Sequence, residues 1–209
     1  MDYRMQENMT EHTPCEPLTW RQYYTIFMQK KRLPYVDYYL GNRRILDVGC
    51  GEGGMLERYN NWQGIDVNQD LVGKCQQRGL PAKVMSAFEM NYANETFDGI
   101  HSAMLIEHFP PNEAFDFLRE SARVMKHNGI LLLTTPGVKR IWNTFSHIRP
   151  YPPAAIKKLL SVATEGYITK SKLPLKLLAA HATTSSLLDP IWQRSDPDGW
   201  VIVLSKTGG

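Results

Sequence analysis

Short apolar runs alternate with stretches of helical periodicity from Gly41 onward. The alternation predicts strands over 43–48, 63–67, 82–86, 97–103 and 129–135, and helices over 53–60, 69–78 and 112–126. The helix over 112–126 is the best marked, because Asn112 is a credible N-cap and Gly129 follows its end. Nearly continuous apolar strands that alternate with helices are typical of an α/β fold, in which helices cover both faces of a mostly parallel sheet.

The chain on either side of this alternation is less regular. Residues 1–17 are polar and aperiodic and predict a mobile arm, whereas residues 18–40 carry aromatic side chains at helical spacing. We expect one or two helices there, broken near Pro34, that either pack on a sheet edge or form a lid over a ligand site. After the alternation ends, the pattern predicts one more helix and two short sheet-closing strands, over 153–163, 166–170 and 199–206.

The composition permits one globular domain. The chain has 209 residues and is 43% hydrophobic and 22% charged, which excludes a disordered chain or a fibre. No apolar run reaches the roughly 20 residues that span a bilayer, and the charged N-terminus lacks the apolar core of a secretory signal. Cys15, Cys50 and Cys75 cannot all pair with one another, so a reducing, cytoplasmic setting is the simplest interpretation.

A glycine-rich turn follows the first predicted strand and opens a helix. Gly49, Gly51 and Gly54 match the G-x-G-x-x-G spacing, which lets the backbone approach a ligand at the carboxyl end of the strand. Asp66 ends the next strand, where a carboxylate can accept hydrogen bonds from both hydroxyls of a ribose. These features fit a nicotinamide cofactor or another adenosine cofactor equally well.

Asp47, two residues before Gly49, favours one of these cofactors. A dinucleotide places a pyrophosphate over such a turn, and an adjacent carboxylate would repel it. S-adenosylmethionine has no phosphate and carries a cationic ammonium and a sulfonium, which an acid would attract directly or through water. Asp47 is also placed to orient the loop by accepting hydrogen bonds from backbone N–H groups, and the two roles are compatible.

Several segments agree with this choice of cofactor in order and spacing. They are the glycine turn at 45–53, a fourth-strand segment at 97–108 that ends in Glu-His, Arg-Val-Met-Lys-His-Asn-Gly at 123–129, Thr-Thr-Pro-Gly at 134–137, and His-Ile-Arg-Pro-Tyr at 147–151 followed by Glu-Gly-Tyr at 165–167. As a set they resemble class I S-adenosylmethionine-dependent methyltransferases. The last segment resembles the small-molecule members, which include quinone-biosynthesis and sugar O-methyltransferases.

The resemblance implies a Rossmann-like three-layer sandwich with a mostly parallel seven-stranded sheet and an N-terminal helical lid. It implies an arm and lid over 1–40 and a methyltransferase domain over 41–209, with a cofactor half at 41–138 and an acceptor half at 139–209. The implied cofactor is S-adenosyl-L-methionine, and the implied activity is methyl transfer to a small-molecule acceptor, most simply at a hydroxyl oxygen. The residues expected to bind the cofactor are Asp47, Gly49, Cys50, Gly51, Gly54, Asp66, Val67, Ser86, Ala87, Phe88, Ala103 and Met104. Ser86 departs from the family pattern, which often has an aspartate there to meet the adenine amino group.

Methyl transfer to a hydroxyl benefits from a general base, and histidine is the usual one. We expect His147 to be the base, because it follows the fifth strand, where this fold builds the acceptor pocket. His108 is the second candidate. The structural alternatives are that Glu107-His108 organises its loop and that His147 is a substrate contact or a plain loop residue. His101 alternates within the fourth strand and is expected to be a packed or hydrogen-bonded core residue.

The acceptor is expected to contact Arg149, Tyr151 and, from the predicted lid, Tyr24. For Arg149 the alternative is a salt bridge, and for Tyr151 it is a core aromatic. No metal site is predicted, because no group of His, Asp and Glu has ligand spacing along the chain.

The net charge of +3 divides unevenly. Residues 1–138 hold 14 Lys and Arg against 17 Asp and Glu, a net −3, whereas residues 139–209 hold 10 against 4, a net +6. The basic half favours an anionic acceptor or one presented at a membrane surface, although a solvated basic face is the simpler alternative. The apolar, Lys-bearing run at 173–180 fits a membrane surface or a buried helix.

Three other functions stay open. A nicotinamide-dependent oxidoreductase would use the glycine turn and Asp66, and the altered Ser86 permits a non-catalytic S-adenosylmethionine-binding module. The basic stretch at 139–176 permits methylation of RNA, but no aromatic stacking platform accompanies it, so a nucleic-acid partner is not expected. The sequence does not indicate the oligomeric state.

Overall fold

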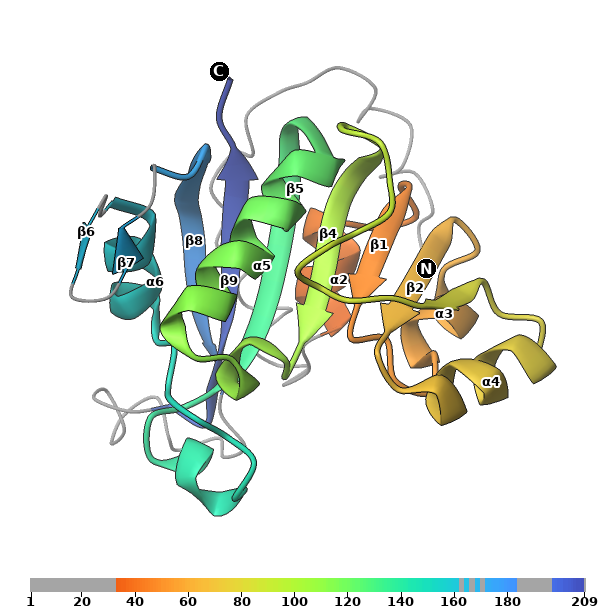
Figure 1. The fold of residues 1–209 in the computed structure, drawn as a ribbon, viewed down its shortest axis with the longest axis horizontal. Coiled ribbons are helices and arrows are strands. Elements are labelled where there is room, and N and C mark those ends of the chain that lie inside the picture. Colours follow the sequence, from red (N-terminus) through yellow and green to blue (C-terminus); the bar gives the residue numbers. More distant parts are fainter. Residues whose placement is uncertain (1–32, 162–163, 166–167, 170–171, 184–196, 209) are drawn as a thin grey trace.

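The computed structural model describes residues 33–161, 164–165, 168–169, 172–183 and 197–208 (Figure 1). Its helices are α2 (Leu33–Tyr39), α3 (Gly54–Arg58), α4 (Gln69–Gln77), α5 (Pro111–Val124) and α6 (Pro153–Ser161), with single 3-10 turns η2 (Ile106–His108) and η3 (Arg140–Asn143). Its strands are β1 (Ile45–Val48), β2 (Trp62–Asp66), β3 (Ala82–Val84), β4 (Phe97–Ala103), β5 (Met125–Pro136), β6 (Thr164–Glu165), β7 (Ile168–Thr169), β8 (Leu175–Thr183) and β9 (Gly199–Lys206).

Seven strands form one sheet in the order β3-β2-β1-β4-β5-β9-β8. Strands β1 to β5 pair in parallel, and β9 runs antiparallel between β5 and β8. The strand order reverses between β1 and β4, and in open α/β sheets ligands bind at such a point, beyond the carboxyl ends of the strands. Those ends lie along the lower edge of the sheet in Figure 1. The topology confirms the predicted Rossmann-like sandwich with its mostly parallel seven-stranded sheet.

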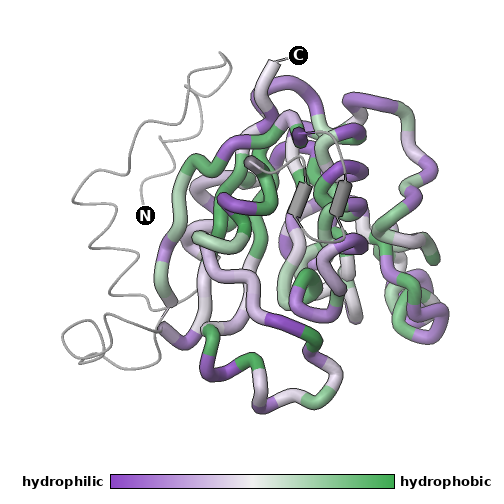
Figure 2. Tube along the Cα trace, turned by 60° about the vertical axis from the view of Figure 1, so that its left-hand side comes forward, coloured by the Kyte–Doolittle hydropathy of each residue, from purple (hydrophilic) through white to green (hydrophobic). Residues whose placement is uncertain are grey.

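Helices cover both faces of the sheet, and each face has its own buried cluster. On one face α5 and α6 bury Phe117 and Ile156 in the same cluster as Leu133 of β5. On the other face Leu56 of α3 shares a cluster with Leu132. Consecutive residues of β5 thus point to opposite cores, which explains why the strand reads as a continuous apolar run. Figure 2 shows the hydrophobic colour concentrated along the inner strands.

Helix α2 belongs to the second core. Tyr35, Tyr39 and Leu40 are buried there, and the Tyr39 hydroxyl lies 2.8 Å from Nε2 of His181 on β8. Residues 33–40 therefore cover the sheet, which corrects the lid interpretation for this part of the segment. The rest of the predicted arm and lid, including Tyr24, lies outside the described residues.

Helix α5 starts differently from the prediction. The residue before the helix is Pro110, Pro111 is its first residue, and Asn112 is therefore not the N-cap. Proline suits the first helical position, because its fixed φ matches the helix and its missing N–H would have had no intrahelical partner.

Strand β5 starts four residues earlier than predicted. The strand already includes Met125, and its pairing register with β4 shifts before Gly99 meets Ile130. Asn128 adopts a left-handed φ of 58°, which asparagine tolerates. A Cβ on Gly129 would lie 2.4 Å from Cγ of Met125, so this irregular stretch requires a glycine.

The C-terminal part of the sheet also differs from the prediction. Instead of one strand over 166–170 that joins the sheet, β6 and β7 pair only with each other. The edge strand is β8, so the run at 173–180 is not a buried helix. The predicted strand over 199–206 is confirmed as β9. Among the residues that the structure describes, no helix has the length and apolar character needed to cross a lipid bilayer.

Candidate functional site

The glycine turn lies at the carboxyl end of β1, next to the reversal of strand order. Gly49 and Gly51 both adopt left-handed φ values, of 75° and 54°. A Cβ on Gly49 would also lie 3.1 Å from the side chain of Leu105, which directly precedes η2. Gly49 is therefore required both by its backbone conformation and by the close packing of the loop that follows β4.

The third structurally required glycine of the turn is Gly53, which the G-x-G-x-x-G spacing does not include. Gly53 is the N-cap of α3 with a φ of 81°, and a Cβ there would lie 2.8 Å from Leu80 and 2.9 Å from Sγ of Cys75. The predicted Gly54 has no left-handed φ, and a Cβ on it would meet nothing within 4 Å. Gly54 therefore adjoins open space, and the glycine is not needed for the turn itself.

The N–H groups of the turn are used inside the protein. Those of Gly49 and Cys50 both donate to the carbonyl oxygen of Ile65, at 2.8 and 3.0 Å, and that of Gly51 donates to Oδ2 of Asp66 at 2.9 Å. These three hydrogen bonds fix the shape of the turn.

The carboxylate of Asp66 joins the glycine turn after β1 to the loop after β2. Its Oδ1 accepts a hydrogen bond from the N–H of Asn68 at 2.9 Å, and its Oδ2 accepts the bond from Gly51. Each carboxylate oxygen retains a second lone pair, so hydroxyl donors can still bind. A Cβ on Gly51 would meet nothing within 4 Å, and Val67 is 71% exposed. This combination of open space and acceptors fits the ribose of an adenosine cofactor.

Asp47 has a partner that the sequence reasoning did not assign. Its Oδ1 accepts a hydrogen bond of 2.6 Å from Nδ1 of His101 on the neighbouring strand, and both side chains are buried beside Trp62. Its carboxylate accepts no backbone N–H among the described residues, so Asp66, and not Asp47, orients the loop. The expectation that His101 is a hydrogen-bonded core residue is confirmed.

The segment after β3 turns through a local hydrogen bond. Oγ of Ser86 accepts from the N–H of Phe88 at 3.1 Å, Ala87 is buried, and the Phe88 ring lies edge-on to Phe109 at 4.8 Å. The Ser86 hydroxyl therefore shapes this turn, and as an acceptor it keeps one lone pair for a ligand.

The side chain of Cys50 is structural. It is buried, and burial is the main cause that raises the pKa of its thiol to about 12. At the end of β4, Ala103 is followed by Met104, which has a left-handed φ of 55° and donates its N–H to Thr134 at 2.8 Å. This bend leads the chain from β4 into η2.

Two histidines that are far apart in the sequence meet beyond the sheet. The rings of His108 and His147 lie edge to face with centroids 4.7 Å apart. The pairing is fixed through the main chain, because the N–H of Ile148 donates to the carbonyl oxygen of Glu107 at 2.9 Å. The structure thus brings together both predicted catalytic residues, and it adds Glu107 to them.

The side chain of Glu107 is fully buried at the centre of this group. Neither carboxylate oxygen has a hydrogen-bond partner within the described structure. Burial raises the pKa of Glu107, and its own backbone and the two imidazoles only partly oppose that shift. A buried carboxylate without a partner is costly and is often found at functional sites.

Two of the expected acceptor contacts, Tyr151 and Arg149, lie within the described residues. Tyr151 is buried, and its hydroxyl donates to the carbonyl oxygen of Phe109 at 2.8 Å. Tyr151 is therefore the core aromatic of the alternative interpretation, which corrects its assignment as a substrate contact. The guanidinium of Arg149 lies 5.3 Å from the centre of the Tyr151 ring, and the residue is exposed.

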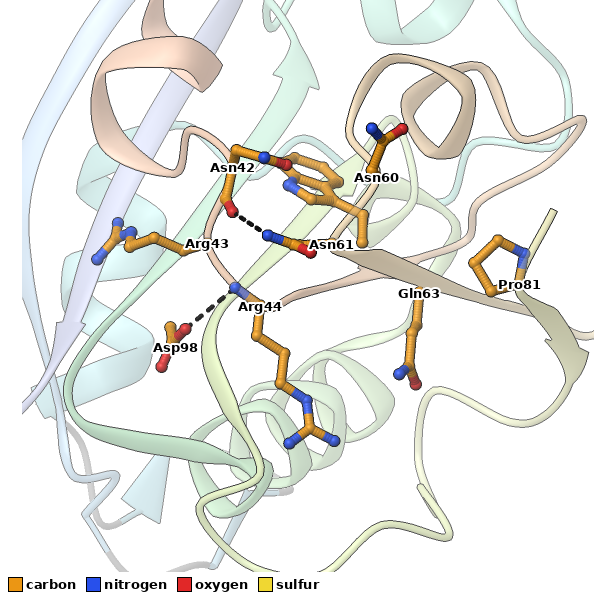
Figure 3. A pocket seen from close by; sticks show the side chains of 9 residues that line it. Asn42, Arg43, Arg44, Asn60, Asn61, Gln63, Pro81 and Asp98 are labelled. Atoms are coloured by element: carbon orange, nitrogen blue, oxygen red, sulfur yellow. Dashed lines mark hydrogen bonds between the residues drawn. The ribbon is translucent and has the colours of Figure 1, made fainter. Parts of the chain in front are cut away.

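A separate polar pocket lies at the opposite edge of the sheet (Figure 3). It has a volume of about 550 Å³ and adjoins the starts of β1, β2 and β4, where Arg44, Gln63 and Asp98 line it. Because ligands of this fold bind at the carboxyl ends of the strands, this pocket is not the cofactor crevice.

Comparisons with known proteins identify the kind of domain that the chain contains. Residues 46–133 match a family model described as "Methyltransferase domain". The fatty-acid O-methyltransferase of Mycolicibacterium smegmatis is 31% identical over 103 residues, which cover 44% of this chain and 36% of that protein. The ubiquinone biosynthesis O-methyltransferase of Xanthomonas oryzae pv. oryzae is 31% identical over 118 residues, which cover 50% of this chain and 48% of that protein. The chain spans less than half the length of these two relatives.

Among solved structures, a SAM-dependent methyltransferase from Archaeoglobus fulgidus has the same fold. The TM-score is 0.63 at 22% identity, and the match covers 88% of this chain and 100% of that chain. Residues 46–133 therefore match a methyltransferase domain, and the chain has the fold of S-adenosylmethionine-dependent methyltransferases. The matched domain and the shared fold imply S-adenosylmethionine as the cofactor.

Proposed function

We propose that the protein transfers the methyl group of S-adenosylmethionine to a hydroxyl oxygen of a small-molecule acceptor. The observation that carries this proposal is the contact between His147 and His108, which lies three residues after Leu105, whose side chain packs on the glycine turn. Proton-accepting groups and the cofactor crevice thus share one edge of the sheet. The two O-methyltransferases among the relatives support oxygen as the methylated atom.

His147 is the proposed base. When bound, S-adenosylmethionine supplies an electrophilic methyl group on a positively charged sulfur. Nδ1 of His147 lies 2.8 Å from the carbonyl oxygen of Ile141, which can only accept, so Nδ1 carries the hydrogen and Nε2 keeps the lone pair. The acceptor's hydroxyl proton would move to Nε2 as its oxygen attacks. The carboxylate of Glu107 is placed to stabilise the resulting imidazolium.

We further propose that the acceptor is amphiphilic and is presented at an anionic membrane surface. Trp142, Phe145 and Ile148 are exposed by 63%, 101% and 50%, and they lie in the segment that carries His147. Exposed Arg149 follows them directly, within the half of the chain that has a net charge of +6. Aromatic and apolar side chains next to basic ones are typical of surfaces that insert into an anionic lipid interface.

The function is tested with labelled S-adenosylmethionine and a fractionated metabolite extract. We expect label in a small-molecule product that resists alkali, because an ether survives conditions that hydrolyse a methyl ester. His147→Asn is expected to lower the rate by about 10² to 10⁴, with affinity for S-adenosylhomocysteine unchanged. His127→Asn, at an exposed ion pair with Glu95, is the matched control.

Three outcomes would contradict this proposal. They are label only in RNA, label in no fraction, and an alkali-labile product that His147→Asn forms at the full rate. The last would mean a carboxylate acceptor, which needs no base.

The membrane surface is tested by sedimentation with phosphatidylglycerol vesicles and with phosphatidylcholine vesicles. We expect binding to the anionic vesicles, and a loss of at least about a hundredfold in the double variant Trp142→Ser/Phe145→Ser, since each of the two side chains contributes about 1.5–3 kcal/mol when buried and about 1.4 kcal/mol is tenfold. Val84→Ser, which changes an exposed apolar residue on β3, should bind like the unmodified protein. The membrane proposal would be overturned if the unmodified protein does not bind anionic vesicles. It would also be overturned if the unmodified protein, the double variant and Val84→Ser all bind them equally.

A further inference from the structure

Three potential metal ligands meet between two loops. Glu107 and His108 lie in η2, after β4, and His147 lies in the loop after η3. One ligand atom from each of Glu107, His108 and His147 lies within 4.8 Å of the other two. Glu107 and His108 are adjacent in the chain, but His147 lies in a different loop, so no spacing in the sequence reveals the group. The pattern-based expectation of no metal site does not take this convergence into account.

The main chain of Glu107 is hydrogen-bonded, but its carboxylate is not. Its main-chain carbonyl oxygen accepts the N–H of Ile148, whereas both carboxylate oxygens are buried without a hydrogen bond in the described structure. Burying an unpaired carboxylate costs on the order of several kcal/mol. Buried charges in proteins are therefore paired with an opposite charge or coordinate a metal. His108 and His147 are the neighbours that would share such a metal.

Both imidazoles are oriented in the way that metal-bound histidines are. Nδ1 of His108 donates to the carbonyl oxygen of Ser146 at 3.1 Å, and Nδ1 of His147 donates to that of Ile141 at 2.8 Å. In a neutral ring this leaves the lone pair on Nε2. Metal-binding histidines commonly donate their other N–H to a backbone carbonyl, which fixes the tautomer and the ring orientation.

We propose that Glu107, His108 and His147 bind one divalent first-row transition-metal ion through the carboxylate and the two Nε2 atoms. Two imidazoles and one carboxylate leave coordination positions open, as in catalytic sites with three protein ligands. Imidazole ligands favour ions such as Zn²⁺ and Fe²⁺, whereas Mg²⁺, Ca²⁺ and Mn²⁺ prefer oxygen ligands. At metal–ligand distances of about 2.1 Å two ligand atoms lie at most about 4.2 Å apart, so the three side chains would close in around a bound ion.

The ion changes the role of His147. If the proposed function holds, a bound ion would offer an open position to the acceptor's hydroxyl oxygen and would lower the pKa of that hydroxyl. The hydroxyl proton would pass to solvent water, and the oxygen would attack the methyl carbon as the carbon–sulfur bond breaks. His147 would then serve as a ligand and not as the base.

The binding step is tested without cofactor or acceptor. Chelator-treated full-length protein is titrated with Co²⁺, followed by its visible absorption, and with Zn²⁺ in a calorimeter. We expect one ion per chain, and a loss of affinity of at least about tenfold in His108→Ala, in His147→Ala and in Glu107→Gln. His127→Ala, which removes an exposed histidine elsewhere, should bind like the unmodified protein.

The two histidine variants change half-buried side chains, so they keep the test decisive if Glu107→Gln does not fold. Circular dichroism checks folding in every variant. No binding at millimolar metal, or binding that none of the three substitutions weakens, would overturn the site. If chelator-treated protein transfers methyl groups at the full rate, the ion has no role in the reaction. Metal binding with no methyl transfer would contradict the proposed function and leave the site standing.

Discussion

Asp66 holds the glycine turn through Gly51, whose N–H donates to Oδ2 of Asp66 across 2.9 Å. The acid of β2 thus fixes the loop after β1, while its second oxygen fixes the N–H of Asn68. One carboxylate connects the turn to the position expected for a ribose. A defect at Asp66 should therefore affect both the shape of the crevice and its affinity.

We predict that Asp66→Asn weakens binding of S-adenosylhomocysteine by at least about tenfold, which is about 1.4 kcal/mol. The amide replaces one acceptor by a donor, so one of the two backbone N–H groups loses its partner. Calorimetric titration measures the affinity. Asp116→Asn, which removes an ion pair with Arg119 on α5, serves as the control and should bind normally. Equal affinities in the two variants would show that Asp66 does not contribute.

The glycines of the turn should respond differently to alanine. Gly53→Ala is expected to lower the free energy of unfolding by about 2 kcal/mol or more, because the left-handed φ and the contacts with Leu80 and Cys75 both oppose a Cβ. Gly54→Ala should change it by no more than about 0.5 kcal/mol. Urea unfolding measures both.

Gly54→Ala also reports on the ligand. Its methyl group would project into the open space beside the turn, so affinity for S-adenosylhomocysteine should fall although stability does not. Unchanged affinity would place the cofactor away from Gly54.

The buried pair of Asp47 and His101 should be sensitive to the loss of its carboxylate. Asp47→Ala leaves the Nδ1–H of His101 without an acceptor and is expected to cost about 3–5 kcal/mol in the free energy of unfolding. Asp47→Asn keeps an acceptor and should cost less than half as much. Chemical unfolding compares the two variants, and equal losses would refute a role for the hydrogen bond.

His181 should make stability depend on pH. Burial lowers its pKa to about 4, from an ordinary value of 6.5, so the folded protein holds it neutral. The unfolded chain takes up a proton below about pH 6.5, so the stabilisation present above that pH is lost as the pH falls toward about 4. The loss is on the order of 2–3 kcal/mol.

His181→Phe removes this titration and keeps a ring against Tyr35. We expect its stability to depend less on pH between about 6.5 and about 4 than that of the unmodified protein, measured by urea unfolding across the range. His127→Phe, at an exposed site, should keep the original dependence. The same slope in both variants would exclude His181 as its source.

The order of strands and helices could be predicted from periodicity because each strand of a parallel sheet is apolar on both faces. The ends of the elements were less predictable. The start of β5 is hidden by the polar residues Lys126 to Asn128, which are exposed although the strand continues through them. The edge strand β8 was missed since only one neighbour supports it and its burial is irregular.

The site was predictable where one segment carries the chemistry and not where two segments meet. Asp47 and His101 are opposite each other only because β1 and β4 pair in a particular register. The same holds for Glu107 and His147, which are brought together by the hydrogen bond from Ile148. Gly53 was missed because its need for glycine comes from Leu80 and Cys75, which are distant in sequence.

The position of β9 has a consequence for how the chain folds as it is synthesised. β8 is made before β9, yet β9 lies between β8 and β5 and is the only strand that pairs with β8 in the described sheet. Until residues 199–206 emerge from the ribosome, the apolar edge of β5 has no partner and β8 cannot dock. A nascent chain paused before Gly199 would therefore expose a strand edge that is prone to aggregation, and chaperones are expected to bind it at that stage.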